Sequence, residues 1–391
     1  MIKIGTRHNL LYPLTFSIFN GLRKIFSILI KKYYNFSGST LLTFIMLFSD
    51  FISGLIVYLN HMKYLKEKEA TKFMGIELIQ APSEITPVDS TIKMAFLIFF
   101  LSYIDFAEHI FSSYYIPVKF KGTSISLEWR LKSIIMCVSG VFSFFVLEIP
   151  IFKHQILSII IILICFLVTI STEMVEYYRE HNKVHGLRYI IFIIFLFIIN
   201  QTFTSGCDII EKYLLEYDFI NPFKLLMLEG AIGMFFRLLF TIHQDPFEQL
   251  KIIKKDHPEY LKYLIICIFI FFLFSCGRNI YRIISNKLYS PTSKALFDYI
   301  FVPFFIIYYF TSFDDFTVHK KKKYYYFAIN LILSFIIVIC CLIYNDLIVL
   351  FFCNLEHDTY YEVSKRAKKI QSEVFELTIN DSCDSNLSDI D

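Results

Sequence analysis

Four long stretches of the chain contain no charged residue at all, and this feature limits the possible fold more than any other. They are residues 156–170, 189–199, 263–274 and 327–343. Each approaches the roughly 20 apolar residues that a membrane-spanning helix needs once its polar flanks are included. In lipid, every backbone N–H and C=O group must be hydrogen-bonded internally, so a spanning segment is a helix or part of a closed barrel. Continuous apolar runs, as opposed to alternating ones, indicate helices.

The composition of the whole chain agrees with this interpretation. Of its 391 residues, 56% are hydrophobic and only 19% are charged, whereas soluble domains carry roughly 25% charged residues. The net charge of +3 is too small to indicate nucleic-acid binding. The nine cysteines are scattered without a CxxC pair, so we expect neither disulfides nor a zinc site. The sequence therefore predicts an all-α polytopic membrane protein that binds lipid and no nucleic acid.

We predict about ten membrane-spanning helices, with boundaries uncertain by a few residues. The first contains Arg23 and Lys24, so an orientation flat in the membrane interface is an alternative for it. An even number of spans puts both termini on one side of the membrane. Loops on that side carry slightly more Lys and Arg, which favours a cytosolic location for the termini. The predicted spans are 9–30, 39–60, 92–116, 124–147, 155–173, 188–208, 222–242, 261–285, 293–312 and 325–352.

These spans divide the chain into two similar halves. A short N-terminal segment, 1–8, precedes a first five-helix repeat, 9–173, which contains a charged and flexible loop at 61–91. A second five-helix repeat covers 174–353. The tail, 354–391, starts as an amphipathic helix. It is rich in Ser, Asp and Asn from about residue 375, where we expect disorder.

A weak internal repeat supports the division into halves. Thr123 and Ser124 are followed three residues later by a leucine, and the pair Thr292 and Ser293 shows the same spacing. Each pair opens an apolar stretch of helix length. With five spans per half, the second half is inverted relative to the first, and inverted repeats with a site at their interface are a transporter architecture. Chance similarity between two apolar helices is the alternative.

Several predicted spans carry polar residues at helical spacing. A charge at bilayer depth costs at least about 2–3 kcal/mol unless it faces protein or water. One such residue is explained by an interhelical hydrogen bond, but five stripes on five helices favour convergence on a polar cavity. The stripes are Asp50, Ser53 and Gly54; Ser102, Asp105, Glu108, His109 and Ser112; Asn200, Thr204, Cys207, Asp208 and Glu211; Glu229, Gly233 and Arg237; and Ser275, Asn279, Arg282 and Asn286.

The start of the seventh span is the most specific local motif. Asn221 precedes Pro222, which is the arrangement of a helix cap followed by proline at the first helical position. Glu229, Gly230 and Gly233 follow on the same predicted helix. Glycines allow two helix backbones to approach closely, so Pro222, Gly230 and Gly233 form a predicted helix-contact motif. A packing motif with a structural carboxylate is the alternative to a functional role for Glu229.

Charged residues of the fourth and ninth spans are candidates for substrate contacts. Lys294 and Asp298 lie four residues apart and fit an ion pair along one helix, although the order Lys before Asp is the weaker one. Alternatively, Lys294 faces the cavity and binds an anionic substrate. Arg130 is the matching residue in the first half, since arginine binds carboxylate or phosphate through two hydrogen bonds.

Motifs of other function classes are missing from the sequence. We find no Walker loop, no HExxH and no GxSxG motif, so an ATP-driven pump, a zinc protease and a serine hydrolase are not expected. His181 and His185 have suitable spacing on one helix face but no third ligand nearby. We therefore expect a protein that is not an enzyme and needs no metal or other cofactor.

The stretch 211–236, EKYLLEYDFINPFKLLMLEGAIGMFF, resembles the signature of solute carrier family 35. It is most similar to the F-type branch, within the drug/metabolite transporter superfamily. That branch shows an acidic-Glu-Lys cluster, a proline, and then Glu-Gly-x-x-Gly; Ile210 replaces the first acidic residue here. The resemblance extends from about Ser39 to the end of the tenth span. Matching residues are Asp105, Thr123, Ser124, Arg130, Glu211, Lys212, Pro222, Glu229, Gly230, Gly233, Thr292, Asp298, Tyr344 and Asn345.

The resemblance implies ten helices in two inverted five-helix halves that exchange substrates by alternating access. Family members carry nucleotide sugars, other phosphorylated metabolites or unknown cargo, usually across Golgi, endoplasmic reticulum or endolysosomal membranes. The chain departs from the family pattern at two further positions. Leu131 stands where the family has glycine after the fourth-span arginine, and Phe301 replaces a ninth-span arginine. The loss of this arginine weakens the case for a strongly anionic substrate.

These observations together predict a secondary transporter of a small metabolite, an antiporter of the nucleotide-sugar type, in an endomembrane. A homodimer is left open. The alternatives are a membrane scaffold that does not transport and, less favoured, a membrane-embedded lipid enzyme. We expect the substrate cavity to be lined by Asp105, Thr123, Ser124, Arg130, Glu229, Asn279, Lys294 and Asp298.

Overall fold

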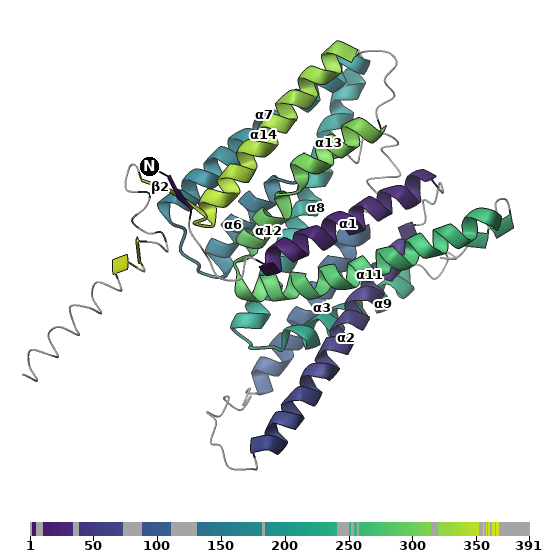
Figure 1. Cartoon of the computed structure of the whole chain (residues 1–391), viewed down its shortest axis with the longest axis vertical. Helices are drawn as coiled ribbons and strands as arrows, with labels where there is room; N and C mark the ends of the chain where they lie inside the picture. The colour runs from purple at the N-terminus through teal and green to yellow at the C-terminus, as the bar shows by residue number, and fades with distance from the viewer. Residues whose placement is uncertain are drawn as a thin grey trace, which may run out of the picture.

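The computed structural model describes residues 2–4, 11–33, 39–72, 88–110, 131–181, 184–240, 250–251, 254–255, 258–313 and 320–351, together with a few tail residues between 355 and 366. Within these ranges the chain is almost entirely helical (Figure 1). The helices are α1 (Leu11–Tyr33), α2 (Ser39–Lys72), α3 (Val88–Ile110), α6 (Ile134–Val146), α7 (Lys153–His181), α8 (Val184–Glu216), α9 (Pro222–Phe240), α11 (Pro258–Leu288), α12 (Pro291–Tyr299), α13 (Val302–Phe313) and α14 (Lys320–Tyr344).

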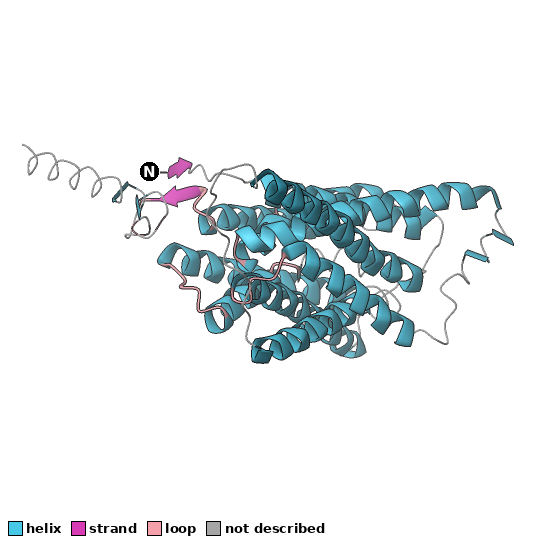
Figure 2. Cartoon of the chain, turned by 90° about the horizontal axis from the view of Figure 1, so that it is seen from below, coloured by secondary structure: helices cyan, strands magenta, loops and turns pink. Residues whose placement is uncertain are grey.

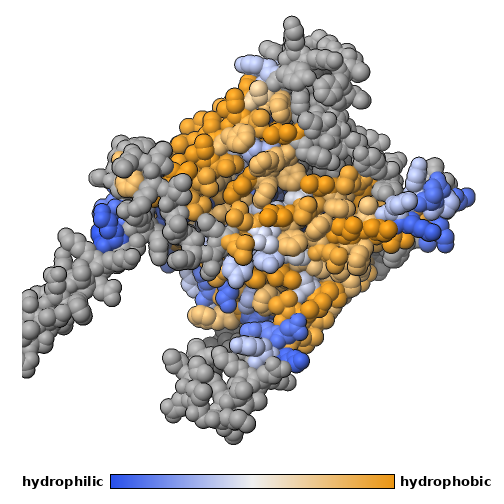
Figure 3. Space-filling view, in the orientation of Figure 1, coloured by the Kyte–Doolittle hydropathy of each residue, from blue (hydrophilic) through white to orange (hydrophobic). Residues whose placement is uncertain are grey.

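The outer surface of the helix bundle is apolar. Apolar side chains cover most of the face seen in Figure 3, between hydrophilic patches at its edges. Phe145 is 73% exposed, and Phe304 and Ile332 are about as open, which in water would be an unfavourable surface of this extent. Four of the described helices contain segments long and apolar enough to cross a membrane, namely Leu41–Tyr64, Lys153–Thr172, Pro258–Leu288 and Tyr325–Tyr344. The chain is therefore an all-α, multi-pass membrane protein.

Several helices are longer than predicted. α2 continues to Lys72 and α3 already begins at Val88, so the predicted loop 61–91 is wrong at residues 61–72 and 88–91; residues 73–87 lie outside the described residues. The apolar pattern ends near residue 60, but Lys, Glu and Ala in the next turns are strong helix formers, and the helix continues beyond its apolar part. In the same way, α7 and α8 occupy most of the stretch 174–187 that separated two predicted spans.

Two predicted spans are interrupted. The span 124–147 has a turn at residues 132–133 before α6, and the span 293–312 breaks at residues 300–301 between α12 and α13. Pro303 explains the second break, because it has no N–H to donate to the carbonyl of Tyr299 and its ring clashes with that carbonyl. Ser290 caps α12, since its Oγ accepts a 3.1 Å hydrogen bond from the N–H of Ser293.

Helices that are far apart in the sequence pack side by side. α2 packs against α9, α1 against α11, α3 against α8, and α7 against α14 (Figure 1). α6 contacts both α8 and α12. In addition, α2 contacts α11, and α3 contacts α9. Aromatic contacts reinforce the α1–α11 pair, where the rings of Phe19 and Tyr281 stack 5.7 Å apart.

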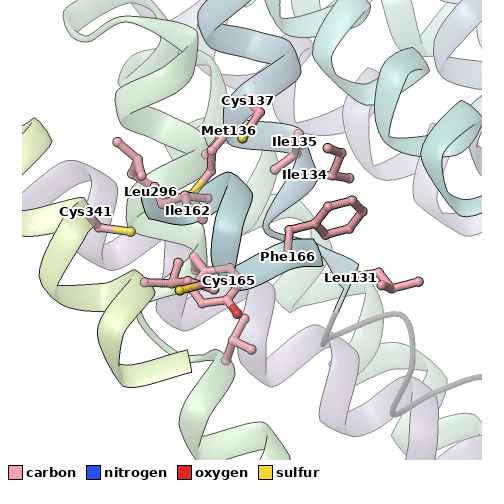
Figure 4. Packing of buried hydrophobic residues seen from close by; sticks show 14 of the residues in the cluster. Leu131, Ile134, Ile135, Met136, Cys137, Ile162, Cys165, Phe166, Leu296 and Cys341 are labelled. Carbon is pink, nitrogen blue, oxygen red and sulfur yellow. The ribbon is translucent and has the colours of Figure 1, made fainter. Parts of the chain in front are cut away.

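The largest apolar core fills the space among α6, α7, α8, α12, α13 and α14 (Figure 4). Met136, Ile162 and Leu296 are fully buried in it, and Cys165 and Cys341 are also enclosed. A second core joins α3, α8, α9 and α11 around Leu214, Leu225 and Ile283. These cores fix the bundle around the polar side chains described below.

Two short strands depart from the all-helical prediction. β1 (Ile2–Ile4) pairs antiparallel with β2 (Ile348–Leu350), so that Ile2 lies opposite Leu350 and Lys3 opposite Val349 (Figure 2). The predicted tenth span therefore ends too late, because α14 stops at Tyr344 and the chain turns through Asp346 with a positive φ of 59°. The pairing holds the start of the chain beside the end of the last helix.

Candidate functional site

The polar stripes of the sequence are buried inside the bundle. On α11, Ser275, Asn279, Arg282 and Asn286 are each at most 3% exposed. The acidic residues of the other stripes are also buried, except Glu108 on α3, which is half-buried; the buried ones are Asp50 on α2, Asp105 on α3, Asp208 and Glu211 on α8, and Glu229 on α9. A buried charge is tolerated only where it is paired or hydrogen-bonded, so the partners of these side chains define the site.

Arg282 is the centre of this buried charged cluster. Its Nη2 donates to Oε2 of Glu229 on α9 at 2.7 Å and lies 3.4 Å from Oε1 of Glu211 on α8. Asn286, one turn further along α11, donates to Oε2 of Glu211 at 2.7 Å and to the backbone carbonyl of Asp208 at 2.9 Å. One guanidinium therefore joins α8, α9 and α11.

Two more carboxylates face the same guanidinium. Asp50 on α2 and Asp105 on α3 both interact electrostatically with Arg282 and with each other. Asp50 is 2% exposed, and its Oδ1 has no hydrogen-bond partner within the described part of the chain. The cluster around Arg282 is thus rich in acidic groups.

Lys294 forms a separate ion pair. Its Nζ binds Oδ1 of Asp208, and both side chains are almost fully buried. The predicted pairing of Lys294 with Asp298 along one helix is therefore wrong. The reason is tertiary: α8 packs against α12 and brings Asp208 to Lys294.

Asp298 takes its partners from the first part of the chain. It binds Nζ of Lys132, which lies at the turn before α6, and accepts a 2.6 Å hydrogen bond from Nδ2 of Asn20 on α1. Asn20 in turn accepts a hydrogen bond from Arg23 at 3.1 Å. This chain of contacts crosses between α1, α6 and α12.

Asn279 links α11 to α2. Its Nδ2 donates to Oγ of Ser49 at 2.9 Å, and its Oδ1 accepts from Nη1 of Arg278 at 2.9 Å. Ser49 is adjacent to Asp50, so this hydrogen bond fixes the position of Asp50 along α2 relative to Arg282 on α11. Both ends of the amide are satisfied, as expected of a buried asparagine.

Glycines bring α2 and α9 into backbone contact beside the cluster. A Cβ atom on Gly230 would lie 2.3 Å from the backbone N of Phe51, and one on Gly54 would lie 2.5 Å from the backbone N of Met227. A Cβ atom on Gly233 would instead meet the side chain of Leu47, at 2.8 Å from its Cδ2. Glu229 precedes Gly230, so this close approach brings its carboxylate to the seam between the helices.

The entry to α9 is capped as the sequence predicts. α9 begins at Pro222, and Oδ1 of Asn221 accepts hydrogen bonds from the N–H groups of Phe223 at 3.0 Å and Lys224 at 3.3 Å. The cap satisfies two of the N–H groups that a helix start leaves without partners. It fixes the register of the α9 residues that follow.

The predicted site residues fall into three groups. Asp105, Glu229 and Asn279 belong to the Arg282 cluster. Lys294 and Asp298 belong to two separate ion pairs, with Asp208 and Lys132 respectively. Thr123, Ser124 and Arg130 lie outside the described residues. The structure also brings residues into these networks that were not predicted to line the cavity. Those that belong to the predicted polar stripes are Asp50, Asp208, Glu211, Arg282 and Asn286, and Lys132 lies outside the stripes.

In the part of the chain that the structure describes, His, Cys, Asp and Glu residues form no group that could hold a metal ion. What the cluster provides is a set of buried acidic groups with fewer cations, arranged across four helices. Such an arrangement can exchange ion-pair partners or protons when the helices move. No protein-family model matches this chain, and no curated protein sequence matches it.

Proposed function

We propose that the protein is a secondary transporter of a small metabolite that works by alternating access. In this proposal the chain forms ten membrane-spanning helices in two inverted five-helix repeats, as its resemblance to the F-type branch of solute carrier family 35 implies. The observation that carries the proposal is the ion pair between Lys132 and Asp298, which joins the turn before α6 in the first half to α12 in the second half, inside the bundle. Charges buried at the interface of two repeats mark a substrate or ion path.

The positions of the helix breaks support the repeat. Thr123 and Thr292 define the offset between the two copies, which is 169 residues. The same offset places Lys132, at the first break, opposite Phe301, at the second. Broken helices near the middle of a transporter supply polar backbone ends to the site, and this chain would then have one in each half.

The helix contacts support it too. The proposal matches α1 with α8, α2 with α9, α3 with α11, α6 with α12 and α13, and α7 with α14. If each helix is replaced by its counterpart in the other half, the α1–α11 contact becomes α8–α3, and the α2–α11 contact becomes α9–α3. All four of these contacts exist. The contacts α2–α9, α6–α12 and α7–α14 convert into themselves, which a pseudo-twofold axis requires.

The paired strands agree with an even number of spans. β1 and β2 lie side by side although they are at opposite ends of the helical region. An even number of crossings returns the chain to the side on which it began, which we propose to be the cytosol. An endomembrane location and an antiport mechanism follow from the family resemblance.

The substrate that we propose is a small anionic metabolite such as a nucleotide sugar. Lys294 and Arg130 would bind its anionic group. Lys294 is already neutralised by Asp208, so the substrate has to displace this carboxylate. Exchange of one partner for another keeps the buried lysine paired during transport.

The test is exchange in liposomes that contain the purified full chain. The liposomes are preloaded with nucleotides and nucleotide sugars, and uptake of labelled nucleotide sugars is measured. Lys294→Gln is run beside Lys224→Gln, which makes the same change at an exposed position of α9. We expect wild type and Lys224→Gln to exchange substrate at similar rates. The exchange rate of Lys294→Gln should be at least tenfold lower.

Two results contradict the proposal. Equal exchange by Lys294→Gln and wild type would remove Lys294 from the substrate site. No exchange of any substrate class by folded wild-type protein would favour the scaffold alternative.

A further inference from the structure

One buried carboxylate of the cluster is left without the partners that its neighbours have. Glu229 and Glu211 share Arg282, and Glu211 also accepts from Asn286. The Oδ1 atom of Asp50, which is 2% exposed, has no hydrogen-bond partner among the described residues. The backbone carbonyl of Asp50 accepts a 3.1 Å hydrogen bond from Ser53 Oγ.

The groups that face Asp50 come from every helix packed around it. Two carboxylates and three arginines interact electrostatically with it, and a thiol lies nearby. The guanidinium of Arg282 already donates to Glu229, and that of Arg278 donates to Asn279. The facing groups are Arg23 on α1, Asp105 on α3, Glu229 on α9, and Cys276, Arg278 and Arg282 on α11.

An ionised carboxylate in this position would be unfavourable. Moving an ion out of water costs several kcal/mol unless hydrogen bonds and a counter-ion compensate. Two further carboxylates interact with Asp50, and the two α11 arginines that do so already donate to Glu229 and Asn279. A buried acid in such surroundings becomes neutral by binding a proton. The neutral acid needs no counter-ion and fits the observed geometry.

Asp50 also lies where the two proposed halves meet. Gly54, one turn along α2, is in backbone contact with α9, and Asn279 of α11 is bonded to the adjacent Ser49. Relative motion of α2 and α9 would change both the water access of Asp50 and its distance from Arg282. Either change favours release of a proton.

We propose that Asp50 is a proton-binding site and that the transporter couples substrate movement to proton movement through it. This inference rests on the proposed alternating-access function. In the arrangement described here, the Asp50 carboxyl group carries a proton. When the halves open, water or the Arg282 guanidinium reaches the group, the O–H bond breaks, and the proton leaves to water on the open side.

Infrared difference spectroscopy of the purified full chain in lipid tests the proton directly, without any transport substrate. A protonated carboxyl group has a C=O stretching band that a carboxylate lacks. We expect wild type to show this band at neutral pH and to lose it at alkaline pH, and we expect Asp50→Asn to lack it at both. Asp298→Asn is the matched control, because Asp298 is paired with Lys132 and Asn20 and should leave the band unchanged.

Three results would overturn the inference. They are absence of the band from wild type at neutral pH, persistence of the band in Asp50→Asn, and loss of the band when sodium is added at constant pH, which would assign a metal-cation site in place of a proton site. If Asp50→Asn does not fold, absence of the band from wild type at neutral pH still overturns the inference. A failed transport assay with an intact Asp50 band would refute the transporter and not the proton site.

Discussion

Arg282 on α11 and Glu229 on α9 form a buried ion pair with an N–O distance of 2.7 Å, and neither side chain has meaningful exposure to solvent. Because Arg282 also serves Glu211, its guanidinium compensates acidic groups from two helices. Removing one partner of such a pair leaves the other charge buried without compensation. Arg282 should therefore contribute more to stability than Glu229, because Arg282 compensates two carboxylates.

Arg282→Gln is expected to lower the free energy of unfolding by about 3–5 kcal/mol, the usual cost of breaking a buried pair. Glu229→Gln should cost less, because Glu211 still compensates the arginine. The double variant should be more stable than the sum of the two single effects predicts. Denaturant titration in detergent measures all three, and strict additivity would contradict the pairing.

The pair Lys132–Asp298 predicts compensation between the proposed halves. Lys132→Asp and Asp298→Lys each place two like charges together inside the bundle, so each should reduce both stability and exchange activity. The combined reversal restores opposite charges and should recover at least part of both. Thermal unfolding and liposome exchange provide the readout; a double variant no better than the worse single one would argue against direct contact.

Gly230→Ala is expected to destabilise the protein by about 1–3 kcal/mol, as other overpacking substitutions do. The new Cβ would meet the backbone N of Phe51 at 2.3 Å, so α2 and α9 have to separate. Gly206→Ala is the matched control, because nothing lies within 4 Å of its Cβ position on α8. The control should gain about 0.5–1 kcal/mol from lower backbone entropy in the unfolded chain. Equal effects of the two substitutions would disprove the close α2–α9 contact.

Asn221→Ala should cost about 0.5–2 kcal/mol, because it removes the acceptor for the N–H groups of Phe223 and Lys224. Asn221→Asp keeps an acceptor oxygen at the same place and should retain most of the stability. The comparison is made by thermal unfolding of the two variants in detergent. A larger loss in Asn221→Asp than in Asn221→Ala would show that the cap does not act through its side-chain oxygen.

The stripe on α11 illustrates how far the sequence alone was sufficient. Helical spacing puts Asn279, Arg282 and Asn286 on one face, and the bilayer requires that face to point inward, so their burial could be predicted. Their partners could not. Ser49, Glu229 and Glu211 come from three other helices, and pairing between helices depends on packing distances that periodicity does not contain.

Lys294 and Asp298 show the same limit in a sharper form. Their four-residue spacing allowed a pair along one helix as one of two alternatives, but each binds a residue far away in the chain. Likewise, the break at residues 300–301 depends on Pro303, which hydropathy treats as part of a continuous apolar span. The sequence could not show either that Oδ1 of Asp50 has no hydrogen-bond partner among the described residues, since this depends on which carboxylates Arg282 pairs with.

The sequence by itself determined that this is a helical membrane protein with inward polar stripes, a capped α9 and small residues at a helix contact. Those features are local: they follow from the length of apolar runs, the 3.6-residue period and the chemistry of Asn, Pro and Gly. Tertiary structure alone decided which charges meet, where two helices break the predicted spans, and that the chain start pairs with β2. A buried charge is stable only when it is paired or hydrogen-bonded. Its partners come from other helices, so folding decides which charges meet.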